Sequence, residues 1–231
     1  MNYFLNHIGK PIIVKLSGEI DIYGTLLDKG SDILVLYNGK DYLYIPLLHI
    51  QRIIFEPSDE ITSQYNIFPL KKKDVSKEEF PIQYDSSISL RKTLQHAKGM
   101  FIEIAVSSNQ TLHGYVTHIM NNYFVFYSPV YKTTFIPFQH LKWLIPYEVN
   151  QSPYCLTREE LPLQPSTMPL ARTFEEQLKR LIGKMIILDL GNAQEKIGKL
   201  EHVHDAFIEL TIARNETVYL SLLHIKAVHC P

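Results

Sequence analysis

The sequence predicts a mainly β chain built from three tandem small barrels, each made of five short strands preceded by a short helix. Three observations lead to this fold class: a repeated spacing of glycines, a histidine at a constant place near the end of each copy, and short apolar runs between them. Self-similarity at a fixed period is typical of a repeated structural unit. The 231 residues, 45% hydrophobic and 20% charged, supply enough apolar side chains for several small cores.

Each copy opens on one glycine and carries a second glycine fifteen residues further along. A histidine followed by isoleucine or leucine closes the copy 25 or 26 residues after that second glycine. These anchors place repeat 1 at residues 1–56, repeat 2 at 88–146 and repeat 3 at 172–231. We interpret the second glycines and the closing histidines as repeat architecture and not as catalytic groups: they are Gly24, Gly114, Gly198, His49, His140 and His224.

Repeat 1 shows the predicted strands most clearly, because its short apolar runs are separated by turn residues. A glycine inside a strand marks a bend or a close backbone approach, so we expect the second glycine of each repeat at the sharpest bend of strand two. Asn38-Gly39 is a strong hairpin signal. We expect His49 and its counterparts to cap the turn before strand five through a ring N–H. The predicted strands cover residues 11–16, 20–27, 33–37, 42–45 and 50–55.

A short helix is predicted ahead of the opening glycine of each repeat, most clearly in repeat 3. Thr173 and Glu176 form a capping box, in which a hydroxyl and a carboxylate satisfy free N–H groups at the helix start. Gly183 ends the helix, because glycine adopts the left-handed conformation at the least cost. The apolar face of this helix consists of Phe174, Leu178, Leu181 and Ile182.

Two proline-rich stretches, residues 57–87 and 147–171, separate the repeats. Proline fixes φ and interrupts both helix and sheet, so we interpret these stretches as linkers. Ordered straps laid across the barrels are the alternative. In the first linker the alternative is favoured by the apolar residues Tyr65, Ile67, Phe68 and Leu70.

Motifs for nucleophilic catalysis, phosphate binding and zinc proteolysis (GxSxG, GxxxxGK[ST] and HExxH) are absent from the sequence. We therefore expect no enzyme activity, no cofactor and no metal. His202 and His204 alternate along a predicted strand and share one face; we expect surface histidines there, with a metal site as the alternative. Cys155 and Cys230 lack the spacing of a zinc site, and we expect free thiols in exposed positions, with intermolecular cross-linking as the alternative.

Aromatic residues concentrate in repeat 2, at Tyr123, Phe124, Phe126, Tyr127, Tyr131 and Phe135. Aromatic rings can stack on the bases of a single strand, but Lys132 is the only basic residue near the cluster. A net charge of −1 gives no general attraction for phosphate. We therefore interpret the cluster as core and protein contact surface, and we expect no tight RNA binding.

The N-terminal residues lack the basic segment and the uninterrupted apolar segment of a secretory signal. No apolar run approaches the roughly 20 residues needed to span a bilayer. We expect a protein that stays in the cytoplasm, or that is assembled onto a structure without crossing a membrane.

The residues of repeat 1 resemble the Sm-like fold, a small five-stranded barrel of the SH3 type. The resemblance rests on the helix end Phe4-Leu5-Asn6, on Gly24, on Asp32 and on the segment 44–50. The bacterial RNA chaperone of that fold carries a lysine–histidine pair before its last strand. Here the residues before the closing histidines are Leu48, Gln139 and Leu223. We therefore keep an RNA-binding Sm-like protein as the alternative function only.

Three such repeats in one chain resemble the N-terminal half of the outer spore coat protein B family of endospore-forming bacilli. The resemblance covers almost the whole chain and includes the closing segments LLHIQRI, FQHLKWL and LLHIKAV. The GGPE element and the Ser/Lys/Arg-rich tail of that family are absent, so the chain resembles a tail-less relative. The resemblance implies a structural protein of the spore coat, made in the mother-cell cytoplasm during sporulation.

The Sm-like resemblance also implies how the repeats contact one another, since strand four of one such barrel pairs with strand five of the next. We expect the repeats to pack together through these edges or through aromatic faces. At least one surface would remain for other spore coat proteins or for self-association.

Overall fold

The computed structural model describes residues 4–55, 57–64, 69, 80–83, 87–106, 110–148, 151–157, 160–161 and 169–231. Within these ranges the chain is mainly β, as predicted, and its helices are short. The strand pairings described below are all antiparallel. Contacts divide the chain into two compact units: unit 1 contains residues 1–111 and 142–151, and unit 2 contains residues 112–141 and 152–231.

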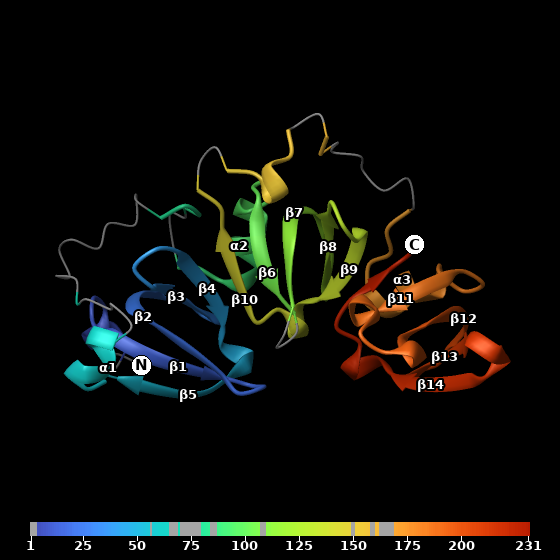
Figure 1. The fold of residues 1–231 in the computed structure, drawn as a ribbon, viewed down its shortest axis with the longest axis horizontal. Coiled ribbons are helices and arrows are strands. Elements are labelled where there is room, and N and C mark those ends of the chain that lie inside the picture. The colour runs from blue at the N-terminus through green and yellow to red at the C-terminus, as the bar shows by residue number, and fades with distance from the viewer. Residues whose placement is uncertain are drawn as a thin grey trace. The chain divides into compact units, whose positions relative to one another are not determined.

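Unit 1 contains all strands of repeat 1 and two strands of repeat 2, next to one another in the order β6-β10-β4-β3-β2-β1-β5 (Figure 1). β1, β3 and β5 have the predicted bounds, whereas β2 and β4 run slightly further than predicted. The strands are β1 (Pro11–Leu16), β2 (Ile20–Lys29), β3 (Ile33–Tyr37), β4 (Tyr42–Pro46), β5 (Ile50–Phe55), β6 (Ile102–Ala105) and β10 (Trp143–Pro146), and the helices are α1 (Asp59–Gln64) and α2 (Leu90–His96).

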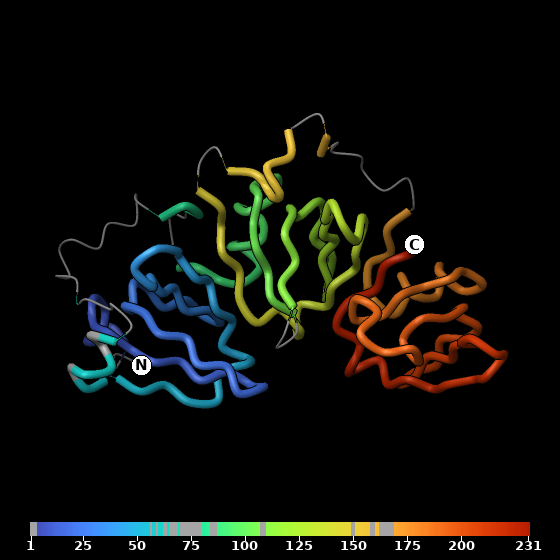
Figure 2. The backbone as a smooth tube through the Cα atoms, in the orientation of Figure 1, coloured from blue at the N-terminus to red at the C-terminus, as the bar shows by residue number. Residues whose placement is uncertain are grey.

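Unit 2 contains all strands of repeat 3 and the other three strands of repeat 2, in the order β14-β13-β12-β11-β15-β9-β8-β7. The tube in Figure 2 follows this part of the backbone from green to red. The strands are β7 (Thr111–Ile119), β8 (Tyr123–Ser128), β9 (Lys132–Pro137), β11 (Met185–Leu188), β12 (Ile197–Val203), β13 (Phe207–Ile212), β14 (Thr217–Ser221) and β15 (Val228–His229), with one helix, α3 (Phe174–Lys179).

Repeats 1 and 3 share one pairing plan. In repeat 1 the order is β4-β3-β2-β1-β5, and in repeat 3 it is β14-β13-β12-β11-β15, so strands one to four form a meander and strand five pairs with strand one. The strands of repeat 2 are divided between the two units, because β6 and β10 belong to unit 1 and β7 to β9 belong to unit 2. The three domain boundaries given above therefore stay a prediction.

Alternation along the strands builds one core in repeat 1 and another in repeat 3. In repeat 1 it consists of Ile12, Val14, Leu16, Ile22, Leu26, Leu34, Leu36, Leu43 and Ile45. The corresponding positions of repeat 3 form a second core, which also takes in α3 and three residues of repeat 2. Those three residues are Tyr123, Val125 and Phe135.

The capping box predicted at the start of α3 is confirmed, with Thr173 and Glu176 each accepting a backbone N–H of the other. The apolar face predicted for this helix is wrong at Ile182, whose side chain is exposed. The α-helix ends at Lys179, and Gly183 lies in the turn that follows, with φ +82°. Repeat 1 has a 3-10 turn, Phe4–His7, in place of an α-helix.

The described parts of the two linkers contain ordered, buried residues. Phe80 and Ile82 of the first linker are buried, and so are Pro153 and Leu161 of the second. α1 was not predicted, since the prolines of the stretch were interpreted as helix-breaking. Four residues that favoured an ordered first linker lie outside the described residues: Tyr65, Ile67, Phe68 and Leu70.

Candidate protein interface

The second glycine of each repeat lies in strand two, directly against a backbone carbonyl of strand three. A Cβ atom would lie 2.9 Å from the Tyr37 oxygen at Gly24, 1.8 Å from the Tyr127 oxygen at Gly114 and 2.6 Å from the Thr211 oxygen at Gly198. These separations are shorter than van der Waals contact, so a side chain would push the two strands apart. Each of these glycines therefore allows a close backbone approach, while its place at the sharpest bend of strand two stays a prediction.

The turn before strand five is closed by the backbone in all three repeats. The N–H groups of the residues after the closing histidines donate to the first residue of each 3-10 turn: Ile50 to Leu47, Leu141 to Phe138 and Ile225 to Leu222. The His49 ring instead lies 3.3 Å from the Ser17 hydroxyl, and the His140 ring lies 3.3 Å from the Gln139 amide. The backbone bond closes each turn, and the capping role of the histidine rings stays a prediction.

The first junction between repeats is the pairing of β4 with β10 in unit 1, where Tyr44 lies opposite Leu144. The Tyr44 hydroxyl accepts the Ile82 N–H at 3.3 Å, and burial raises the pKa of Tyr44 above its ordinary range. Lys142 lies next to this pairing and donates from Nζ to the Ser17 carbonyl at 2.7 Å. Strand four of repeat 1 thus binds strand five of repeat 2.

The second junction has the same form in unit 2, where β9 pairs with β15. Phe135 lies opposite Val228, and Thr134 lies opposite His229. Phe135 and Val228 belong to one buried cluster, so the aromatic side chain of repeat 2 completes the core of repeat 3. Strand four of one repeat therefore pairs with strand five of the next at both junctions.

A helix start reinforces each junction. In unit 1 the N–H of Leu90, at the start of α2, donates to Asp32 Oδ1 at 2.8 Å. In unit 2 the N–H of Phe174, at the start of α3, donates to Asn122 Oδ1, also at 2.8 Å. Asp32 and Asn122 occupy the same position, in the turn between strands two and three. An Asp or Asn side chain can satisfy a free N–H of the first helical turn, and here it does so for the helix of the next repeat.

Tyr123, the first residue of β8, anchors the second junction next to this turn. Its hydroxyl donates to the Ala171 carbonyl at 2.8 Å and lies 3.1 Å from Gln177 Oε1. Burial raises the pKa of Tyr123 to about 12, although the nearby Arg180 acts in the opposite direction. The aromatic cluster of repeat 2 is thus confirmed as buried core at four of its members, which are Tyr123, Phe124, Phe126 and Phe135.

Repeat 3 presents the same strand positions to solvent. The register places Phe207, Glu209 and Tyr219 where repeat 2 has Tyr123, Val125 and Phe135, and we call these three residues the outer face of repeat 3. Phe207 is 48% exposed and Tyr219 is 61% exposed, whereas Tyr44 and Phe135 are 0% and 2% exposed. Ala206 stands in the position of Asp32 and Asn122 and offers no side-chain acceptor.

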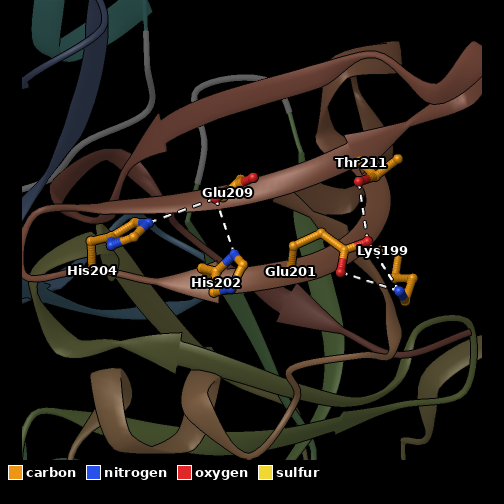
Figure 3. Close-up of polar contacts among 6 residues, drawn as sticks. All are labelled: Lys199, Glu201, His202, His204, Glu209 and Thr211. Carbon is orange, nitrogen blue, oxygen red and sulfur yellow. Dashed lines mark hydrogen bonds and ion pairs between the residues drawn. The ribbon is translucent and has the colours of Figure 1, made fainter.

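The two alternating histidines lie beside this outer face (Figure 3). His202 Nδ1 is 3.1 Å from Glu209 Oε2, and His204 Nε2 is 3.7 Å from the same oxygen. The prediction that both rings share one face is confirmed by their stacked arrangement, with centroids 6.0 Å apart. Among the described residues, no group of three or more His, Cys, Asp or Glu side chains is arranged to hold a metal ion.

The neighbouring charges on β12 form a second small network, also drawn in Figure 3. Lys199 Nζ donates to Glu201 at 3.0 Å, and the Thr211 hydroxyl donates to the same carboxylate at 3.1 Å. The hydrogen bond from Lys199 lowers the pKa of Glu201. Charged and polar side chains of β12 and β13 thus contact one another on this part of repeat 3.

The sequence model of the family described as YwrJ third domain matches residues 173–228, which lie within repeat 3. The uncharacterized protein YwrJ of Bacillus subtilis (strain 168) is 42% identical over 231 residues, covering 100% of this chain and 99% of that protein. The chain belongs to the YwrJ family. This similarity extends across all three repeats and both linkers.

The YwrJ relative is uncharacterized, so membership of the family brings no activity or partner with it. In the part of the chain that the structure describes, no helix has the length and apolar character needed to cross a membrane. Both cysteines are free thiols. Cys155 is exposed as expected, whereas Cys230 is half-buried, which raises the pKa of its thiol.

The junction residues were not identified as a site from the sequence. Asp32 was noted only as part of a resemblance, and Tyr44 only as part of a strand. An alignment of the three repeats on their closing histidines would have brought Tyr44, Phe135 and Tyr219 into one column. An alignment on the second glycines would have brought Asp32, Asn122 and Ala206 into another.

Proposed function

We propose that this protein is a structural and assembly component of the bacterial spore coat, built from three tandem Sm-like barrels and acting through protein–protein contacts. In this proposal it is not an enzyme and needs no cofactor. The contacting surfaces are strand edges and the aromatic side chains beside them. Its partners are other spore coat proteins or further copies of itself.

The observation that carries the proposal is the junction between strand four and strand five, which occurs twice within one chain. Exposed strand edges bind other strands through their backbone groups, with adjacent side chains giving specificity. A chain that joins its own repeats in this way has surfaces of the same kind at its remaining edges. Such a design favours assembly over catalysis, because small barrels seldom form a deep polar pocket.

Two further observations support the spore coat as the place of action. The closing segments of the repeats resemble those of the outer spore coat protein B family, as described above. The YwrJ relative comes from a bacillus, the group in which that coat family occurs.

The test is the location of a fluorescently tagged copy in sporulating cells. We expect the tagged protein to form a shell around the developing spore and to stay with the coat fraction of purified spores, while the tag alone stays diffuse. Tagged protein that remains diffuse in the mother cell throughout sporulation would contradict the proposal. The RNA-binding alternative is tested on the purified chain, whose ratio of absorbance at 260 and 280 nm would be raised by bound RNA.

A further inference from the structure

Two strand edges remain open among the described residues, and they are the two halves of the junction already present in the chain. β14, strand four of repeat 3, has only β13 as a strand partner. β5, strand five of repeat 1, has only β1. Each internal junction joins a strand four to a strand five, so the edges left over have matching roles.

The backbone of β14 presents hydrogen-bonding groups at its open edge in the same phase as the internal junctions. Alternate residues of an antiparallel strand direct their N–H and C=O groups to opposite sides. The Leu222 N–H donates to the Ala206 carbonyl, so Tyr219, three residues earlier, directs its groups away from β13. The same argument holds at the internal junctions, where the N–H groups of Leu47 and Phe138 donate to strand three's preceding turn. Tyr44 and Phe135 each lie three residues earlier, so their N–H and C=O groups point toward β10 and β15.

β5 presents the complementary residue. The Leu26 N–H donates to the Lys10 carbonyl, so the even-numbered residues of β1, Val14 included, direct their groups toward β2. Ile53 lies opposite Val14, and its own N–H and C=O groups therefore point to the open side. Ile53 occupies the position of Leu144 and Val228, the residues opposite Tyr44 and Phe135 at the internal junctions.

The side chains at these edges are exposed where their counterparts are buried. Leu144 and Val228 are buried, whereas Ile53 is partly exposed and packs against the edge of the repeat 1 core. Phe135 completes the core that contains Val228. Tyr219, at the position of Phe135, has its ring exposed in this chain.

We propose that β14 of one copy pairs antiparallel with β5 of a second copy, with Tyr219 opposite Ile53. The inference rests on the proposed assembly function and names a second copy of this chain as the partner. The contact is head-to-tail, because different strands of the two copies meet, so each copy in an assembly uses both edges.

The contact between copies is weaker than the internal junctions. Ala206 provides no acceptor for a helix start, and Glu209 stands where repeats 1 and 2 have buried valines. The strand edge and the exposed Tyr219 ring carry the proposed contact with the second copy. The association is therefore reversible and depends on protein concentration, which makes it measurable by sedimentation.

The experiment uses the full chain with one edge blocked at a time. Tyr219→Glu places a charge at the β14 edge, and Ile53→Lys does the same at the β5 edge. Tyr154→Glu is the matched control, because Tyr154 is 58% exposed and lies in a 3-10 turn, not on a strand. A circular dichroism melt establishes folding. If Ile53→Lys is unfolded, Ile53→Pro replaces it, since the N–H that proline lacks is directed at the open side, where an edge strand tolerates proline.

We expect the average mass of the wild type and of Tyr154→Glu to rise with concentration, and both edge variants to associate at least about tenfold more weakly. An equimolar mixture of Tyr219→Glu and Ile53→Lys should form dimers, because one partner keeps β14 and the other keeps β5. A wild type that stays monomeric, an edge variant that associates like the wild type, or a mixture that stays monomeric would overturn the pairing. The proposed function fails separately, if tagged wild-type protein is absent from the coat.

Discussion

Strand four carries an aromatic residue at the same position in all three repeats, but the environment of that residue in the third repeat is opposite to that in the first two. Tyr44 and Phe135 are buried against strand five of the next repeat, while Tyr219 is 61% exposed. The same contrast holds in the turn before strand three, where Asp32 and Asn122 hold a helix start and Ala206 holds none. The difference shows that a residue of strand four is buried when strand five of the next repeat pairs with it. The residues of its own repeat do not decide its burial.

The largest expected effect is the difference in stability lost when Phe135 or Tyr219 is replaced by alanine. Phe135→Ala removes a ring from a buried cluster and should lower the free energy of unfolding by about 3–5 kcal/mol. Tyr219→Ala, measured in dilute solution, removes an exposed ring and should change it by less than about 0.5 kcal/mol. Urea denaturation followed by circular dichroism measures both. Equal losses in the two variants would remove the distinction between the junctions and the outer face of repeat 3.

The strand-two glycines should matter in every repeat, whether or not its outer face is covered. Valine at Gly114, where a Cβ would lie 1.8 Å from the Tyr127 oxygen, should destabilise the chain by more than about 1 kcal/mol. Gly24→Val should cost less, because the corresponding separation is 2.9 Å. A thermal melt unchanged by Gly114→Val would contradict the structural role of these glycines.

The helix contact provides a smaller and more local comparison. Asn122→Ala removes the acceptor of the Phe174 N–H and should cost about 0.5–2 kcal/mol, the usual range for a lost helix cap. Ala206→Asn restores an acceptor where no helix start is bound and should stay within about 0.5 kcal/mol of the wild type. Hydrogen exchange at the start of α3 should rise in the first variant only. Unchanged exchange there would show that Asn122 does not hold the helix.

The second junction should weaken on acidification because of His229. Burial lowers the pKa of this histidine below its ordinary value of about 6.5, and its ring lies beside the Tyr131 ring and opposite Thr134. The unfolded chain therefore binds the proton first, and this contribution to stability, present above about pH 6.5, is lost as pH falls toward the lower folded-state pKa.

The matched variant for this pH effect is His229→Ile, because repeats 1 and 2 have Ile54 and Ile145 at the same position. Urea midpoints at about pH 7.5 and about pH 5.5 should differ less in His229→Ile than in the wild type. An unchanged difference would assign the pH dependence to other groups.

The smallest expected effect is on RNA. The exposed rings of Phe207 and Tyr219 could stack on bases, but Leu223 precedes His224 where the RNA chaperone has lysine, and the net charge is −1. We expect no binding of short A-rich or U-rich RNA with a Kd below about 1 μM at physiological salt. Fluorescence anisotropy measures it, and tighter binding would favour the RNA-binding alternative.

The secondary structure of repeat 1 was largely readable from the sequence. The bounds of β1, β3 and β5 followed from short apolar runs between turn residues, and the start of α3 followed from Thr173 and Glu176. The errors concern a helix end and a helix within a proline-rich stretch. Ile182 continues an apolar helical pattern beyond the end of α3, and α1 forms within a stretch interpreted as a linker.

The sequence by itself indicated the short strands of repeat 1, the helix start at Thr173 and the place of the second glycines within strand two, because turns, alternation and close strand contacts depend on neighbouring residues. Only the tertiary structure decided which edges are joined. Tyr44 and Tyr219 are the same residue at the same point of strand four, yet one is buried and the other exposed. The reason is physical: burial at a strand edge requires a second strand from a distant part of the chain, and no local pattern records whether that strand is present.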